Sequence, residues 1–151
     1  MGLLGQMYRL LTVAGPEQGA GTDDRRPLQL RINEYRRQLD MNSLPEGSPE
    51  AQHAKVMLHE MEKQLAERNT HAQELETQDQ QDAAMELYEA NVADMFDGSL
   101  PYERLLTIYT HQGAKKEAQR IARACLAHAA YQLSPDVRAM CLAVLSEDMR
   151  K

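Results

Sequence analysis

From residue 27 onward, apolar residues recur three and four positions apart, and proline or glycine interrupts this pattern at intervals. This period matches one face of an α-helix, whereas a β-strand would alternate apolar and polar side chains. No stretch of the sequence alternates in that way. The apolar composition agrees, because the chain has no Trp, a single Phe and nine Met beside many Leu and Ala, which favour helices. The sequence therefore predicts an all-α protein.

The chain divides into three parts by composition. Residues 1–12 are expected to form a short amphipathic helix, and residues 13–26 contain several Gly and a Pro, which indicate a flexible linker. Residues 27–151 are long enough for a single all-helical domain with its own core. The apolar stripe of the first helix would contact either the rest of the chain or a partner, and it consists of Leu3, Leu4, Met7 and Leu11.

Residue pairs typical of helix starts divide residues 27–151. Pro27, with Asp23 and Asp24 before it, predicts one helix start. Ser48-Pro49 and Ser134-Pro135 each combine an N-cap with a proline in the first turn. The helix that starts at Ser48-Pro49 is the longest, and its apolar positions resemble the seam of a coiled coil, which favours an intramolecular hairpin over a dimeric rod. The seam consists of Ala54, Leu58, Met61, Leu65, Arg68, Ala72 and Leu75.

The apolar seam of the long helix ends at Leu75. Thr77 and Gln80 have the spacing of a capping box, which predicts a fresh helix at this point. Residues 97–101 (Asp-Gly-Ser-Leu-Pro) then predict the end of this helix and, through Ser99 as N-cap, the start of the next one. Two antiparallel helices, at residues 100–112 and 115–131, are expected to follow.

The first of these two helices carries Tyr102, Leu105, Leu106 and Tyr109, and Gly113 and Ala118 follow at the turn and on the second helix. The spacing resembles a tetratricopeptide repeat (TPR), with Ala84 and Tyr88 matching part of a preceding unit, so that one to one and a half repeats cover residues 79–133. The chain departs from the repeat at Leu106, where a small residue is usual, and at Ala122, where Phe is usual. The resemblance implies an array of antiparallel helical hairpins with a long central helix and a C-terminal capping helix.

Proteins of this family bind peptides or helices along the first helix of each pair. The resemblance therefore implies a partner-binding face made of Glu103, Thr107, Thr110 and His111. The Lys, Arg and Asn residues that grip a C-terminal carboxylate in some family members are missing from this face, so a clamp for chaperone tails is disfavoured.

Charge gives an alternative hypothesis. Residues 46–103 hold fourteen acidic residues against three basic ones, whereas residues 104–151 hold eight basic against four acidic. The basic helix 115–131 could act as the recognition helix of a nucleic-acid-binding regulator, with Lys115, Lys116, Arg120 and Arg123 on it. The formal net charge of -6 and the bulky Tyr109 near the turn argue against nucleic acid.

Catalytic and metal-binding patterns are weak. Glu50 and His53 have the spacing found in di-iron bundles, but no second copy of the motif accompanies them. Cys125, His128 and Cys141 lack the paired spacing of a zinc site, and we expect both cysteines to be reduced core thiols. The sequence thus predicts no catalytic residue, no metal and no cofactor.

The hypothesis that follows is a non-catalytic adaptor that binds a protein of unidentified type, or a second copy of itself as a homo-oligomer. No apolar run reaches the length of a membrane span, and two cysteines in apolar helices fit a reducing environment. A cytoplasmic location without membrane attachment is expected.

Overall fold

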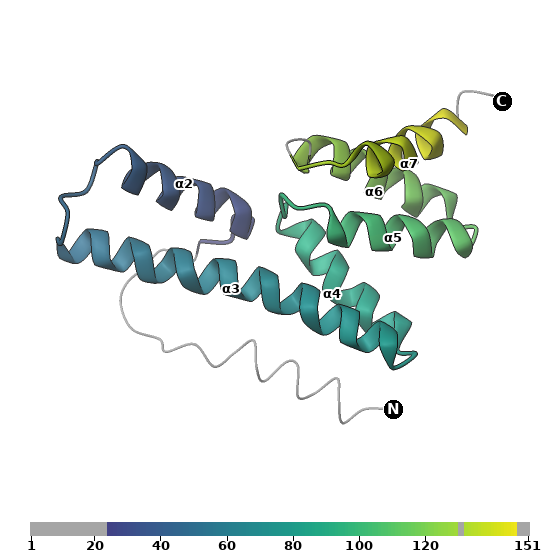
Figure 1. Cartoon of the computed structure of the whole chain (residues 1–151), viewed down its shortest axis with the longest axis horizontal. Coiled ribbons are helices and arrows are strands. Elements are labelled where there is room, and N and C mark those ends of the chain that lie inside the picture. Colours follow the sequence, from purple (N-terminus) through teal and green to yellow (C-terminus); the bar gives the residue numbers. More distant parts are fainter. Residues whose placement is uncertain (1–23, 130–131, 148–151) are drawn as a thin grey trace.

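A computed structural model describes residues 24–129 and 132–147 of the chain. Within these residues every regular element is a helix and no strand occurs, which confirms the all-α prediction. The helix predicted at residues 1–12, with Leu3, Leu4, Met7 and Leu11, lies outside the described residues. The six helices (Figure 1) are α2 (Leu28–Asp40), α3 (Pro49–Thr77), α4 (Gln81–Ala93), α5 (Leu100–His111), α6 (Lys115–His128) and α7 (Pro135–Ser146).

Two serine-proline pairs start helices as the sequence predicts. The Ser48 hydroxyl accepts a hydrogen bond from the Ala51 N–H at 3.1 Å at the start of α3. The Ser134 hydroxyl accepts one from the Val137 N–H at 3.3 Å at the start of α7. Each serine satisfies one of the N–H groups that lack a partner in the first turn of a helix.

The break between α3 and α4 falls where it was predicted, but the capping box is wrong. Thr77 is the last residue of α3, and its hydroxyl donates to the Glu74 carbonyl at 2.6 Å. The chain leaves the helix through Asp79, whose φ of 57° places it in the left-handed region. The Gln80 N–H then bonds back to the Leu75 carbonyl at 2.9 Å. This pattern is a Schellman motif, which ends a helix through its own backbone.

Helix α4 ends at Ala93, four residues before the predicted stop at residues 97–101. Met95 adopts a φ of 59°, and the Phe96 N–H bonds to the Asn91 carbonyl at 3.0 Å in a second Schellman motif. A Cβ on Gly98 would lie 2.6 Å from Cε1 of Phe96, so a larger residue at this position would require the Phe96 ring to move. Ser99 precedes α5 without a side-chain capping bond.

Two hydrophobic clusters hold the helices together. The larger cluster joins the C-terminal end of α3 to α4, α5, α6 and α7. The smaller one joins α2 to the middle of α3, from Met57 to Leu65, with Phe96 packed against it. Each described helix also packs on the next one along the chain, and α5 additionally contacts α7. The molecule is therefore elongated, with α2 at one end and α7 at the other (Figure 1).

A polar cluster joins α2, α3 and α4 where the two hydrophobic clusters meet. The buried Asn91 amide donates to the Leu65 carbonyl at 2.9 Å and to Oδ1 of Asn69 at 2.7 Å. Nη1 of Arg68 lies 2.5 Å from Oδ2 of Asp94. The arginine expected in the apolar seam of α3 is thus held by an acid from α4.

Candidate protein-binding site

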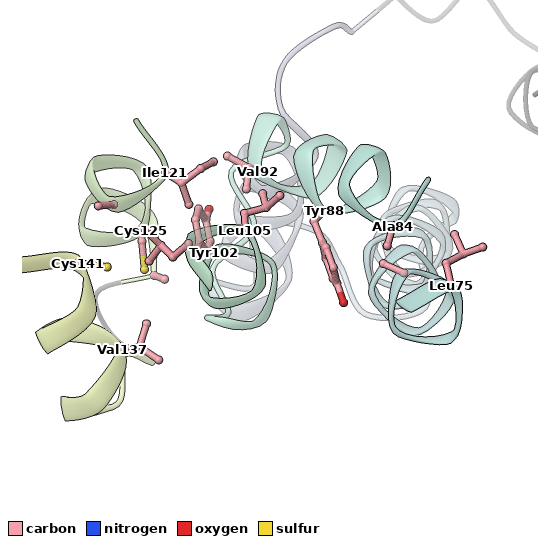
Figure 2. Packing of buried hydrophobic residues seen from close by; sticks show 14 residues of the cluster. Leu75, Ala84, Tyr88, Val92, Tyr102, Leu105, Ile121, Cys125, Val137 and Cys141 are labelled. Atoms are coloured by element: carbon pink, nitrogen blue, oxygen red, sulfur yellow. The ribbon is translucent and has the colours of Figure 1, made fainter. Parts of the chain in front are cut away.

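The residues that suggested a helical repeat pack together in the larger cluster. Tyr102 and Leu105 of α5 are fully buried, as are Ala122 and nearly all of Ala118 on α6. Figure 2 shows Tyr102 next to Cys125 of α6 and Leu105 next to Val92 of α4. The Tyr102 hydroxyl donates to the Phe96 carbonyl at 2.6 Å, so its polar atom is satisfied inside the core. This packing fixes the position of α5, the helix that carries the predicted binding face.

An ion-pair network at the other end of α5 fixes α4, α5 and α6 together. The Tyr109 hydroxyl donates to Oε1 of Glu89 at 2.6 Å, and Nη2 of Arg120 lies 2.5 Å from the same oxygen. Burial, assisted by this hydrogen bond, raises the pKa of Tyr109 to about 12. Arg120 also pairs with Glu117 at 2.6 Å. The phenol therefore stays protonated at neutral pH and serves as a donor.

A second network connects α3, α4 and α5. Nη2 of Arg104 lies 2.6 Å from Oε1 of Glu76, and the Tyr88 hydroxyl donates to Oε2 of Glu76 at 2.7 Å. The hydrogen bond from Arg104 lowers the pKa of the Glu76 carboxyl, against the opposing effect of burial. The acidic and basic parts of the sequence therefore meet within the molecule, because Glu76 and Glu89 come from the acidic part and Arg104 and Arg120 from the basic part.

The four α5 residues predicted to bind a partner have different surroundings. Glu103 is half-buried, while Thr107, Thr110 and His111 are exposed. The Thr107 hydroxyl donates to the Glu103 carbonyl at 2.9 Å within the helix, so the hydroxyl is engaged by the backbone. Thr110 lines a cavity.

That cavity, called here the Thr110 pocket, has a volume of about 200 Å³ and lies where the α5–α6 turn meets the last turns of α7. The side chains of Tyr109, Ala118 and Val144 give it apolar walls, and Lys115 and Glu147 bring opposite charges to it. The sequence did not point to the contribution of α7, because it depends on the contacts of α7 with α5 and α6. The lining residues are Tyr109, Thr110, Gly113, Lys115, Ala118, Gln119, Val144 and Glu147.

A second cavity, of about 350 Å³, lies between α2 and α3. It contains Glu50 and His53, the pair considered for a di-iron site, together with Tyr35, Leu44 and Pro49. Within the described ranges, no three His, Cys, Asp or Glu side chains come close enough to hold a metal ion. This cavity therefore offers an apolar recess and no ligand set.

The basic face of α6 is partly used inside the molecule. Lys115, Lys116 and Arg123 are exposed, but Arg120 is engaged by Glu89 and Glu117. Two carboxylates beside a guanidinium reduce its attraction for a phosphate. This arrangement weakens the contribution of one of the four cations on which the nucleic-acid hypothesis depends.

The two cysteines lie together inside the core. Cys125 of α6 and Cys141 of α7 are both free thiols with no exposed surface, and Figure 2 shows them side by side. Their mutual hydrogen bond and burial raise the pKa of Cys125. Sequence reasoning weighed the two cysteines together only as metal ligands with His128, and did not predict this direct thiol–thiol contact between helices.

In the part of the chain that the structure describes, no helix is both long enough and apolar enough to cross a membrane. Comparison of the chain with models of protein families, with curated proteins and with solved structures gives no match.

Proposed function

We propose that the protein is a non-catalytic adaptor that binds a protein partner on a TPR-like array of antiparallel helical hairpins. Two packing features support the array. Tyr102, Leu105, Ala118 and Ala122 are buried where α5 and α6 meet, and α5 also contacts α7, as first helices of successive pairs do in a stacked repeat. A reducing, cytoplasmic setting belongs to the proposal, because the two buried cysteines are unpaired.

The single observation that carries the proposal is the Thr110 pocket. Its apolar walls and charged surroundings have the composition of a protein interface, where an apolar centre is surrounded by polar residues. Its volume of about 200 Å³ is below the roughly 300–1,000 Å³ typical of small-molecule sites. The pocket therefore suits one anchoring side chain of a bound peptide better than a cofactor or a metabolite.

Peptide selection tests this proposal directly. Purified full-length protein would be used to select peptides from a displayed random library, and the affinity of the enriched peptides would be measured for variants. Thr110→Arg fills the entrance of the pocket with a long charged side chain and is expected to reduce affinity at least tenfold. Gln64→Arg, which adds the same side chain at an exposed position of α3, is the matched control and should leave affinity unchanged.

Titration with a DNA duplex and with an RNA strand distinguishes the nucleic-acid alternative. Binding to phosphates weakens steeply as salt rises, whereas binding in an apolar pocket does not. Salt-sensitive DNA or RNA binding that is lost in Lys115→Glu/Lys116→Glu, together with no enriched peptide, would reject the adaptor proposal in favour of that alternative.

A further inference from the structure

The middle two turns of helix α7, between Arg138 and Ser146, are apolar on every side, yet the described residues cover only one side of them. Residues 139–145 (Ala-Met-Cys-Leu-Ala-Val-Leu) form two turns without a polar side chain. Val137 and Cys141 are buried against the larger cluster, whereas Leu142 is 53% exposed. A helix that is apolar all round is normally buried on all sides. The outer side of α7 therefore lacks a covering element among the described helices.

The uncovered side has the composition of a helix-docking surface, bordered by the exposed Arg138 one turn from Leu142. Ala139, Leu142 and Ala143 are all exposed, and their spacing places them on one stripe, which we call the outer face of α7. Small residues beside a leucine allow the backbone of a second helix to approach closely. In Figure 1, α7 lies at the end of the molecule, and its contacts are with α6 and α5.

The chain itself contains a segment with matching properties. Residues 2–12 have an apolar stripe at helical spacing and one charged side chain, Arg9. A segment of about eleven residues cannot maintain a helix alone in water, because helix nucleation costs more than so few hydrogen bonds return. Such a segment becomes helical only against an apolar surface, and the outer face of α7 is one.

The linker is long enough to bring the two together within one molecule. Residues 13–23 can span up to about 36 Å when extended. Just beyond them, the N-terminus of α2 is anchored at Asp94, next to the start of α5, through a bond from Leu28. Helix α5, with its 12 residues, is about 18 Å long and contacts α7 directly. The reach of the linker therefore exceeds the length of the helix it has to pass.

We propose that residues 2–12 dock as a helix on the outer face of α7 of the same chain. Leu142 would insert between the apolar side chains of the segment, with Ala139 and Ala143 beneath its backbone. The inference does not rest on the proposed function, since it concerns two parts of one chain. In this arrangement the N-terminal segment is the helix that covers the outer face of α7.

Hydrogen exchange measured by mass spectrometry on the full-length protein tests the proposal. Amides of residues 3–11 are expected to be protected, and Leu142→Lys should remove this protection without changing exchange in α4 and α5. Val56→Lys is the matched control, because Val56 is 59% exposed on α3, far from α7 in the sequence. In the segment, Met7→Lys should remove protection, whereas Gln6→Lys, off the apolar stripe, should retain it.

Three outcomes would overturn the proposal. Residues 3–11 could exchange as fast as an unstructured peptide. They could stay protected in Leu142→Lys, which would mean that the segment docks elsewhere. Protection could also disappear on dilution as the solution mass falls, which would assign the outer face of α7 to a second copy of the chain. Protection that is independent of protein concentration and specific to Leu142 supports docking within one molecule.

Discussion

The carboxylate of Asp94, at the end of α4, accepts a hydrogen bond at 3.1 Å from the backbone N–H of Leu28, 66 residues earlier in the sequence. The Asp94 carbonyl also accepts from the Gln29 N–H at 3.1 Å. The first turn of α2 is thus capped by another helix, since α2 has no capping side chain of its own. Asp94 also pairs with Arg68 at 2.5 Å, so one residue joins three helices.

Replacing Asp94 is expected to destabilise the fold more than an ordinary surface change. Asp94→Ala removes a helix cap and leaves the largely buried Arg68 guanidinium without its acid, for a cost of about 2–4 kcal/mol. Asp94→Asn retains an oxygen for Leu28 and should cost less. Urea unfolding followed by circular dichroism measures both, with Glu67→Ala on the exposed side of α3 as the control. Equal stability of Asp94→Ala and Glu67→Ala would show that the cap contributes nothing.

Enlarging Ala118 tests the packing of α5 on α6. The side chain is buried with 3% exposure, so Ala118→Leu adds volume where none is free and should cost about 1–3 kcal/mol. Lys116→Leu introduces the same side chain two residues earlier at an exposed position. The melting temperature of Ala118→Leu should fall well below that of the control. Coinciding melting curves would count against close packing of these helices.

Met95 is expected to be a site where glycine stabilises the protein. Its φ of 59° is unfavourable for a residue with a Cβ, and glycine adopts it without that penalty. Met95→Gly should therefore raise the free energy of unfolding by about 0.5–1 kcal/mol. Ala93→Gly, two residues earlier at the exposed end of α4, should lower it by a similar amount. A loss of stability in Met95→Gly would show that contacts of the Met95 side chain outweigh the backbone strain.

The Glu76 network predicts a dependence of stability on pH. The pKa of Glu76 is lowered in the folded protein, mainly by the hydrogen bond with Arg104, relative to its ordinary value of 4.5. The unfolded chain therefore binds the proton more tightly, and the stabilisation is present above about pH 4.5 and is lost as pH falls through the folded-state pKa. Urea unfolding across this range should show a weaker loss for Glu76→Gln than for the unaltered protein. Parallel curves for the two proteins would contradict this account.

Local signals were enough to predict most helix starts. Ser48 and Ser134 cap their helices because an N-cap needs only its own side chain and a backbone group three residues away. Helix ends were harder, since Asp79 and Met95 end helices without the glycine that usually marks such positions. Thr77 had the right spacing for a capping box, but its hydroxyl bonds to the preceding turn.

Contacts between distant parts of the chain were beyond sequence reasoning. Asp24 lies beside the first turn of α2, where it pairs with Arg26 at 2.8 Å and with Arg31 at 3.5 Å, but the hydrogen bonds that cap this turn come from Asp94, which the sequence did not indicate. Of the residues predicted on α5, Thr110 lines a pocket whose other wall comes from α7. Neighbouring residues in the sequence do not indicate either contact, because each depends on how whole helices pack.

Helix α3 supplies buried residues to both hydrophobic clusters, with Met61 and Leu65 in one and Ala72 and Leu75 in the other. In a linear array, the free energy of opening an element depends on the interfaces that it loses, and an end element loses fewest. Of the two end helices, α2 packs on α3, whereas α7 packs on α6 and also contacts α5. Detachment of α2 would expose the smaller cluster and fray the first half of α3, while the second half stays clamped by α4. The molecule should therefore unfold in a fixed sequence of local openings that begins at α2, and binding near α7 would leave that first step unchanged.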